Sequence, residues 1–437
     1  MSAESVRERL DAALARIDDL SGEGMRACLT VYRAAARAAA DAADARARAG
    51  ISLGPLDGAI VTIKDLFDVA GEVTRAGSKV LAEEGKPAET DAEVVRRLRA
   101  AGAVIVAKTN MSEFAFTGIG INPHFGTPGN PADRARAPGG SSSGAAVSAA
   151  DGMCEIAIGS DTGGSCRVPA ALCGVVGFKP SRQRIPTVGA FPLSYTLDSI
   201  GSLAKSVAAC ARADAVMAGE APSSSNWALD PAPLAGLRLG IAQGLPLENL
   251  DDTVGKRFPE ALDRLEKAGA RLSNEKLPLI DDMMRALARA SILVAEAYSV
   301  HRDRLARRGA DIDQIVRGRT EKGRDISAAD YIETVRARVA LLQAMDARLA
   351  DLDALVMPTT ATVAPRIDEV SEPKAFMARN ALLLRNTTIA NFFDLTAISL
   401  PLPRDGGLPA GLMLLARNGR DRHLFRIAAA VERLFAA

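Results

Sequence analysis

The sequence predicts an α/β fold, and three consecutive segments carry that prediction. Residues 58–63 (Gly-Ala-Ile-Val-Thr-Ile) form a short β-branched run that is typical of a buried strand. Residues 90–93 (Thr-Asp-Ala-Glu) match a capping box, and an amphipathic helix follows them. Residues 103–107 (Ala-Val-Ile-Val-Ala) form a second apolar run. A strand, a helix and a strand in succession favour parallel pairing within one sheet.

The rest of the chain continues this alternation of helices and strands. Residues 4–49 predict two helices rich in Ala, Arg and Asp, ending at Gly50. Further elements are predicted as strands near 237–241, 355, 398 and 412, and as helices over 253–268, 281–307 and 327–350 and from 421. We find no internal repeat. We expect an N-terminal helical segment, 1–50, that packs on one main domain, 51–437.

Composition excludes several classes of partner. The 437 residues carry a formal net charge of +1, with no basic block, which argues against nucleic acid and anionic membranes as partners. The five cysteines form no C-x-x-C pair, which is poor material for disulfides or a zinc site and fits a reducing compartment. No run of 18 apolar residues occurs. We therefore expect a soluble, cytoplasmic protein.

The chemistry-bearing residues exclude most cofactor-dependent reactions. The chain has only three histidines, His124, His301 and His423, and His, Cys, Asp and Glu form no cluster at metal-ligand spacing. Neither a P-loop nor a dinucleotide-binding glycine motif is present. We therefore expect no metal and no organic cofactor.

Serine and glycine are instead dense between residues 118 and 174. Residues 138–144 (Pro-Gly-Gly-Ser-Ser-Ser-Gly) lead into the apolar segment 145–150, as a loop that feeds a helix N-terminus would. Residues 159–165 (Gly-Ser-Asp-Thr-Gly-Gly-Ser) follow the apolar run 154–158. Two glycines before a serine allow consecutive N–H groups to converge beside its hydroxyl, where an oxyanion would form.

A serine nucleophile needs a base, and histidine is scarce here. Lys64 closes the apolar run 58–63, where burial would lower the pKa of its amine towards neutrality. By position alone, however, a lysine at a strand end is ordinarily a solvated residue.

The sequence resembles the amidase signature hydrolases. The resemblance rests on motifs that occur in family order, at 62–65 (Thr-Ile-Lys-Asp), 108–114 (Lys-Thr-Asn-Met-Ser-Glu-Phe), 126–131, 139–142 (Gly-Gly-Ser-Ser), 159–165, 168–180, 395–401 and 407–411. It covers the chain from about residue 50 to the C-terminus. The serine motif departs from the family's usual Gly-Gly-Ser-Ser-Gly-Gly, because Ser143 and Ala145 replace or shift the glycines.

The resemblance implies a fold, a reaction and a set of residues. The fold would be one α/β domain, a mixed twisted sheet covered by helices on both faces. The reaction would be hydrolysis of a carboxamide C–N bond, which releases ammonia or an amine and a carboxylic acid. Ser165 would be the nucleophile that forms the acyl-enzyme, Ser141 the bridging serine on a cis peptide and Lys64 the base. The oxyanion hole would consist of the backbone N–H groups of Thr162, Gly163, Gly164 and Ser165.

Some of these residues have simpler interpretations. Ser141 and Ser142 would also serve as helix caps, Asp161 would brace the glycine loop, and Arg167 would be an ion-pair partner. Pocket candidates are apolar or aromatic and suggest small to medium, uncharged or aromatic acyl groups; they are Met111, Phe116, Ile119, Phe191 and Tyr195. An acidic substrate would need a cation that the sequence does not identify.

Several alternative functions stay open at this point. One is the glutaminase A subunit of a tRNA-dependent amidotransferase, and a related one is a partner-dependent hydrolase of specialised amide or urea-type substrates. Another is an α/β-hydrolase esterase, because residues 140–144 match G-x-S-x-G with Ser142 as nucleophile and His301 or His423 as base. A third is a catalytically inactive interaction protein. The expected partner is a small-molecule amide, and a homodimer is left open.

Overall fold

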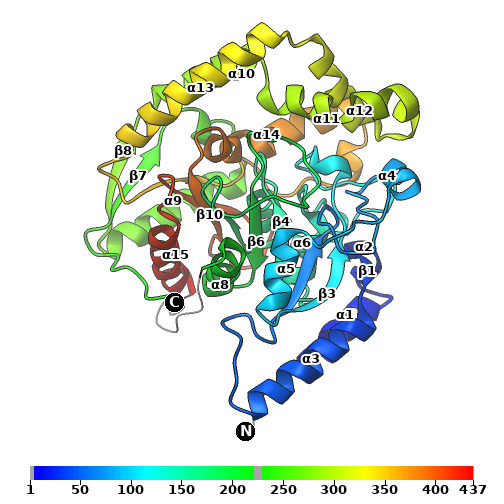
Figure 1. Cartoon of the computed structure of the whole chain (residues 1–437). Helices are drawn as coiled ribbons and strands as arrows, with labels where there is room; N and C mark the ends of the chain where they lie inside the picture. The colour runs from blue at the N-terminus through cyan, green and yellow to red at the C-terminus, as the bar shows by residue number, and fades with distance from the viewer. Residues whose placement is uncertain (1–3, 221–228, 437) are drawn as a thin grey trace.

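One twisted β-sheet runs through the molecule (Figure 1). The computed structural model describes residues 4–220 and 229–436. Strands in these residues are β1 (Cys28–Val31), β2 (Ile60–Lys64), β3 (Val104–Thr109), β4 (Ile156–Ser160), β5 (Val176–Lys179), β6 (Ile200–Ala204), β7 (Arg238–Ala242), β8 (Arg271–Glu275), β9 (Ala354–Pro358), β10 (Thr396–Pro401) and β11 (Gly411–Ala416). They line up in the order β1-β3-β2-β4-β6-β5-β10-β11-β9-β7-β8. Pairing is parallel within β3-β2-β4 and β9-β7-β8 and antiparallel elsewhere, so the sheet is mixed.

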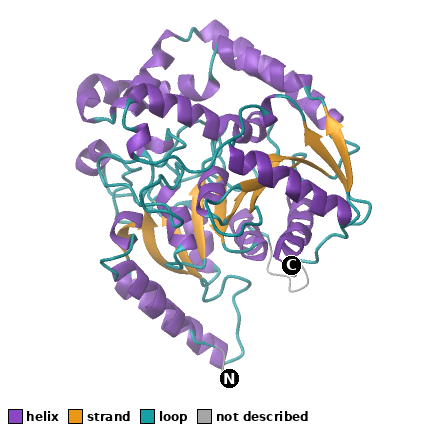
Figure 2. Ribbon diagram, turned by 180° about the vertical axis from the view of Figure 1, so that it is seen from behind, coloured by secondary structure: helices purple, strands orange, loops and turns teal. Residues whose placement is uncertain are grey.

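Helices cover both faces of this sheet, as Figures 1 and 2 show. They are α1 (Val6–Asp18), α2 (Gly24–Ala27), α3 (Arg33–Arg48), α4 (Lys79–Glu84), α5 (Glu93–Ala100), α6 (Ser143–Ala150), α7 (Arg167–Cys173), α8 (Val207–Ala218), α9 (Asp252–Lys267), α10 (Pro278–Arg289), α11 (Ile292–Arg308), α12 (Gln314–Glu321), α13 (Ala328–Arg348), α14 (Pro373–Phe392) and α15 (Asp421–Ala436). No helix in the described ranges combines the length and apolarity needed to cross a lipid bilayer.

Strand β3 shows why both faces must be covered. Val104 and Val106 pack in a hydrophobic cluster with residues of α1, α3 and α6. Ile105, between them, packs in a different cluster with residues of α5, α8 and α15. Successive side chains of a strand point to opposite faces, so a continuous apolar run needs helices on each side. The predicted α/β sheet with helices on both faces is therefore confirmed.

The N-terminal region contains more than the two helices predicted over 4–49. Residues 28–31 form β1, which pairs antiparallel with β3 through Val31 and Ala107. The backbone N–H of Tyr32 extends this pairing by donating to Val106 O at 2.8 Å. A run this short has no readable periodicity, and only its position beside β3 makes it a strand. The division of the chain at residue 50 remains a prediction.

The capping box predicted at residues 90–93 does not form. Helix α5 begins at Glu93 after Ala92, and no side chain caps it. The Glu93 carboxylate instead accepts hydrogen bonds from Arg96 at 2.7 and 2.8 Å and from Arg97 at 2.7 Å. Two arginines within a turn therefore compete successfully for the carboxylate that a capping box requires.

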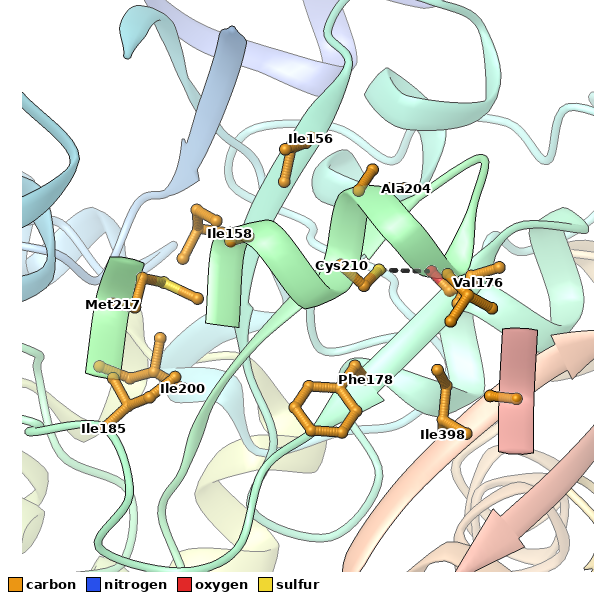
Figure 3. Close-up of a cluster of buried hydrophobic side chains, with 14 of the residues drawn as sticks. Ile156, Ile158, Val176, Phe178, Ile185, Ile200, Ala204, Cys210, Met217 and Ile398 are labelled. Atoms are coloured by element: carbon orange, nitrogen blue, oxygen red, sulfur yellow. Dashed lines mark hydrogen bonds between the residues drawn. The ribbon is translucent and has the colours of Figure 1, made fainter. Parts of the chain in front are cut away.

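Helix α8 covers the middle of the sheet in a densely packed core (Figure 3). The Phe178 side chain of β5 is fully buried there, and its ring centroid lies 4.1 Å from that of Phe425 of α15. Ile156 and Ile200 from neighbouring strands belong to the same cluster. This core holds β4 and β5 in place, and the loop that leads from β4 to α7, as described below, contains the candidate nucleophile.

We expect Phe178→Ala to lower the free energy of unfolding by about 3–5 kcal/mol, because it removes a buried ring and leaves a cavity. Urea unfolding at neutral pH measures this change. Phe435→Ala, near the end of α15 where the ring is only partly buried, is the control and should cost less. Equal losses from both substitutions would contradict the importance of this cluster.

Candidate active site

Lys64 lies at the end of β2, between β3 and β4, and its side chain is 0% exposed. Its amine Nζ donates hydrogen bonds to Ser141 Oγ at 2.7 Å and to Ser160 Oγ at 2.9 Å. No carboxylate pairs with this amine in the part of the chain that the structure describes. Burial is the main cause that lowers the pKa of Lys64 to about 7. An amine with this pKa can accept a proton at neutral pH.

Ser141 is held beside Lys64 by an unusual backbone. The Gly140–Ser141 peptide bond is cis, as the resemblance implies. The Ser141 carbonyl accepts a hydrogen bond from Ser112 N at 3.0 Å, and Gly140 N donates to Gly118 O at 2.8 Å. The following residue, Ser142, is the N-cap of α6, yet its side chain makes no cap bond and donates to Ser160 O instead. The predicted capping role of Ser142 is therefore wrong, because the neighbouring strand supplies a better acceptor.

Ser165 follows β4 in the loop that leads to α7, and it retains 4% exposure. Its carbonyl accepts a hydrogen bond from Ser142 N at 3.3 Å, which joins the two serine-containing loops. Within the described residues, the backbone N–H groups of Thr162, Gly163, Gly164 and Ser165 donate to no acceptor. Four unoccupied donors beside a serine hydroxyl are suited to stabilise an oxyanion.

Gly164 allows this loop to pass close to α14. Its φ of +135° is a conformation that side chains rarely adopt. A Cβ atom here would lie 2.1 Å from Thr387 Oγ1. Thr387 in turn donates to Gly163 O at 2.7 Å, so α14 supports the loop directly.

A buried ion pair fixes the other end of the loop. Asp161 and Arg167 are both fully buried and form a salt bridge of 2.8 Å, as predicted for Arg167. Burial would by itself raise the pKa of Asp161, but Arg167 outweighs it and lowers that pKa to about 2. The carboxylate also accepts hydrogen bonds from Cys166 N at 3.0 Å and Asn391 Nδ2 at 3.0 Å. Asp161 thus carries a permanent charge that is neutralised within the loop.

A cavity of about 220 Å³ borders the loop. It is lined by Leu66, Ala115, Ser160, Thr162, Thr187, Ala190, Phe191, Pro192, Leu193, Tyr195, Asp198, Ser199 and Ile200. The predicted pocket residues Phe191 and Tyr195 are among them. Met111, Phe116 and Ile119 lie instead in hydrophobic clusters and are almost fully buried.

Asp198 was not predicted from the sequence, although it lines this cavity. Its carboxylate accepts a hydrogen bond from Thr162 Oγ1 at 2.6 Å and from Leu193 N at 3.0 Å. Burial raises the pKa of Asp198 to about 6. Ser160 was also missed as a partner of Lys64. Its place at the end of β4, the strand parallel to β2, is the signal that could have identified it.

The comparisons with known proteins extend the resemblance to almost the whole chain. Residues 8–425 match the family described as Amidase. The 2-amino-5-chloromuconic acid deaminase of Comamonas testosteroni is 34% identical over 447 residues, which cover 99% of this chain and 95% of that protein. The A subunit of the glutamyl-tRNA(Gln) amidotransferase of Koribacter versatilis is likewise 34% identical, over 97% of this chain and 93% of its own length. A crystal structure of an amidase, 31% identical, superposes with a TM-score of 0.87 over 98% of this chain and 96% of that one.

We expect Asp161→Asn to lower the free energy of unfolding by about 3 kcal/mol at pH 7, because it leaves the Arg167 charge buried without its partner. Denaturant unfolding measures the loss. The control is Glu333→Gln, which breaks the exposed Arg289–Glu333 pair of 2.6 Å and should cost less than about 1 kcal/mol. A loss for Asp161→Asn as small as that of the control would show that the buried pair does not hold the loop.

Proposed function

This chain belongs to the amidase family, and we propose that it hydrolyses a carboxamide C–N bond through an acyl-enzyme on Ser165. The products are ammonia or an amine and a carboxylic acid. The observation that carries this proposal is the 2.7 Å hydrogen bond from the buried Lys64 amine to Ser141 Oγ. It places a base of near-neutral pKa next to the serine that adjoins the nucleophile loop.

In the proposed first half-reaction, neutral Lys64 takes the proton of Ser141 while Ser141 takes that of Ser165. The Ser165 oxygen bonds to the amide carbon, and the carbonyl oxygen becomes an oxyanion that accepts hydrogen bonds from the N–H groups of residues 162–165. The proton then passes back through Ser141 to the amide nitrogen. The C–N bond breaks, ammonia or an amine leaves, and an ester on Ser165 remains.

In the second half-reaction, water attacks the ester carbon and gives its proton to the same relay. The C–O bond to Ser165 breaks, the acid leaves, and the Ser165 hydroxyl recovers its proton. No step in this sequence uses a metal or an organic cofactor. The cavity lined by Phe191 and Tyr195 is suited to an apolar part of the substrate.

A second candidate function is that of a glutaminase A subunit. The similarity to the amidotransferase subunit of Koribacter versatilis spans 93% of that protein, which favours this alternative. Such a subunit, like a specialised partner-dependent hydrolase, would depend on other proteins for activity. The esterase alternative is wrong, because the family and the fold are those of amidases.

A cytoplasmic location is also part of the proposal. All five cysteines are buried and free, which agrees with a reducing compartment.

We expect the purified chain to release ammonia from a panel of aliphatic, aromatic and dicarboxylic amides that includes glutamine and urea-type amides. Ser165→Ala should reduce this release to the background. Activity of the isolated chain would support a free amidase and argue against a partner-dependent subunit. Silence of the folded wild-type protein across the panel would contradict the proposal of an independent amidase.

We expect kcat/KM to rise as the pH increases through about 7, because only the neutral Lys64 amine accepts a proton and its pKa is about 7. Lys64→Met should lower kcat by about 10²- to 10⁴-fold. The control is Lys108→Met, which removes another buried lysine at the end of β3 and should lower kcat much less. The Lys108 amine lies 3.5 Å from the Glu72 carboxylate and has no part in the proposed mechanism. A rate that stays constant between pH 5 and 8 would contradict the role of Lys64.

A further inference from the structure

Asp198 lies beside the nucleophile loop, residues 161–165, and the proposed mechanism does not use it. Together with Thr162 it lines the cavity of about 220 Å³. Its Oδ1 atom accepts a hydrogen bond from Thr162 Oγ1 at 2.6 Å. Its Oδ2 atom accepts from the backbone N–H groups of Leu193 at 3.0 Å and Ser194 at 3.1 Å. Both carboxylate oxygens are therefore occupied by groups of the protein, and one of them is bound by the loop that holds the candidate oxyanion hole.

The bond between Thr162 and Asp198 continues the pairing of β4 with β6 beyond the strands. The two strands pair antiparallel, and Ser160 belongs to the last pair of their register. Asp161 comes next, opposite Ser199: Asp161 N donates to Ser199 O at 2.7 Å, and Ser199 Oγ donates to Asp161 O at 2.7 Å. Thr162 and Asp198 form the following pair in this register, but here two side chains make the bond.

The two glycines that follow Thr162 give the nucleophile loop little stiffness of its own. Glycine backbones populate many conformations, so hydrogen bonds must fix the direction of the N–H groups. One such bond comes from α14, where Thr387 Oγ1 donates to Gly163 O at 2.7 Å. The Thr162–Gly163 peptide thus lies between two anchors, the Thr387 hydroxyl and the Asp198 carboxylate. Loss of either anchor would free the Gly163 N–H to turn.

Asp198 can serve as an anchor because its own segment is fixed. The Asp198 N–H donates to Ser194 O at 2.9 Å, which closes a turn. Glu296 of α11 accepts a hydrogen bond from Ser194 Oγ, and Tyr331 OH of α13 donates to the same carboxylate at 2.7 Å. Two helices thus hold the segment that carries Asp198.

We propose that Asp198 is a positioning residue that, through the Thr162 hydroxyl, aims the N–H groups of the nucleophile loop at the oxyanion of the reaction. This inference rests on the amidase function proposed above and adds a residue to its machinery. In this role Asp198 acts through Thr162, without contact to the reacting atoms. The oxyanion exists only after attack on the carbonyl, so the alignment should affect kcat and have little effect on KM.

Thr162→Val tests the contact, because valine has nearly the shape of threonine and lacks its hydroxyl. With the fastest amide of the panel, we expect kcat to fall about 10- to 100-fold and KM to change less than about threefold. Thr162→Ser restores the hydroxyl and should keep kcat within about threefold of the wild-type value. Thr334→Val is the matched control. The Thr334 side chain is also buried and donates to Ala286 O at 3.2 Å, between α13 and α10, so its loss should leave kcat within about twofold.

Two substitutions of Asp198 test the other side of the bond. Asp198→Ala removes the acceptor and should lower kcat as Thr162→Val does. The double variant should show no further loss, because both changes break the same bond. Should Asp198→Ala fail to fold, the comparison of Thr162→Val with Thr162→Ser decides alone.

Asp198→Asn keeps the shape of the side chain and removes its charge. The amide can accept through its oxygen from the N–H groups of residues 193 and 194 and donate through its nitrogen to Thr162 Oγ1. We therefore expect Asp198→Asn to keep kcat within about fivefold of the wild-type value.

Any of four results would overturn the proposal. The first is a kcat of Thr162→Val equal to that of the Thr334→Val control. The second is a rise in KM in place of the fall in kcat, which would assign the pair to substrate binding in the cavity. The third is a loss in Thr162→Ser as large as that in Thr162→Val. The fourth is a double variant in which the losses of Thr162→Val and Asp198→Ala add.

Covalent labelling separates this inference from the proposed function. In the reaction with a fluorophosphonate, the Ser165 oxygen bonds to phosphorus, the P–F bond breaks, fluoride leaves, and the serine proton passes to the Lys64 relay. Negative charge develops on the phosphoryl oxygen, so the labelling rate also depends on the oxyanion hole. We expect Thr162→Val and Asp198→Ala to slow the labelling of Ser165 about 10-fold, and Thr162→Ser to leave it nearly unchanged.

The two readouts distinguish the possible failures. Labelling of Ser165 with this dependence, but without hydrolysis of any amide, would contradict the proposed function and support the positioning role. Hydrolysis that does not depend on Thr162 or Asp198 would support the function and overturn the positioning role. Absence of both labelling and hydrolysis in the folded protein would overturn both.

Discussion

The site depends on the burial of one amine, that of Lys64, at the end of a central strand. Strands β3 and β4 on either side exclude water, and the two nearest partners are hydroxyl groups, Ser141 and Ser160. The neutral hydroxyl groups stabilise the charged form of the amine much less than a carboxylate would, so burial can lower its pKa. In the proposed mechanism, a lysine therefore takes the place that histidine has in many serine hydrolases.

The low pKa of the Lys64 amine requires that the nearby charge of Asp161 be neutralised, because an unpaired carboxylate would raise that pKa. Asp161 lies in the same loop as Ser165, the proposed nucleophile, and Arg167 neutralises its charge in a fully buried pair. Asn391 of α14 hydrogen-bonds to both Asp161 and Arg167, so one network links this loop to helix α14.

The predictions failed where another contact, local or tertiary, competed successfully for the groups of a local pattern. The capping box at residues 90–93 is formed by suitable residues, yet the Glu93 carboxylate is drawn to Arg96 and Arg97. Ser142 has the composition of a helix cap, yet its hydroxyl bonds to the end of β4. Strands β1, β4, β5, β6 and β8 were not predicted, because short runs with Gly, Ser or Thr acquire their conformation from pairing with neighbours.

The sequence by itself determined the α/β class and the strands β2, β3, β7, β9, β10 and β11, because hydrophobic periodicity is a property of neighbouring residues. The resemblance of their motifs to those of a family singled out Lys64, Ser141 and Ser165. Only the tertiary structure decided which groups meet the Lys64 amine and which helix supports the nucleophile loop. Asn391 lies 230 residues from Asp161 along the chain, and Asp198 lies 36 residues from Thr162. No local pattern encodes such pairs, because the packing of the whole sheet and its helices brings them together.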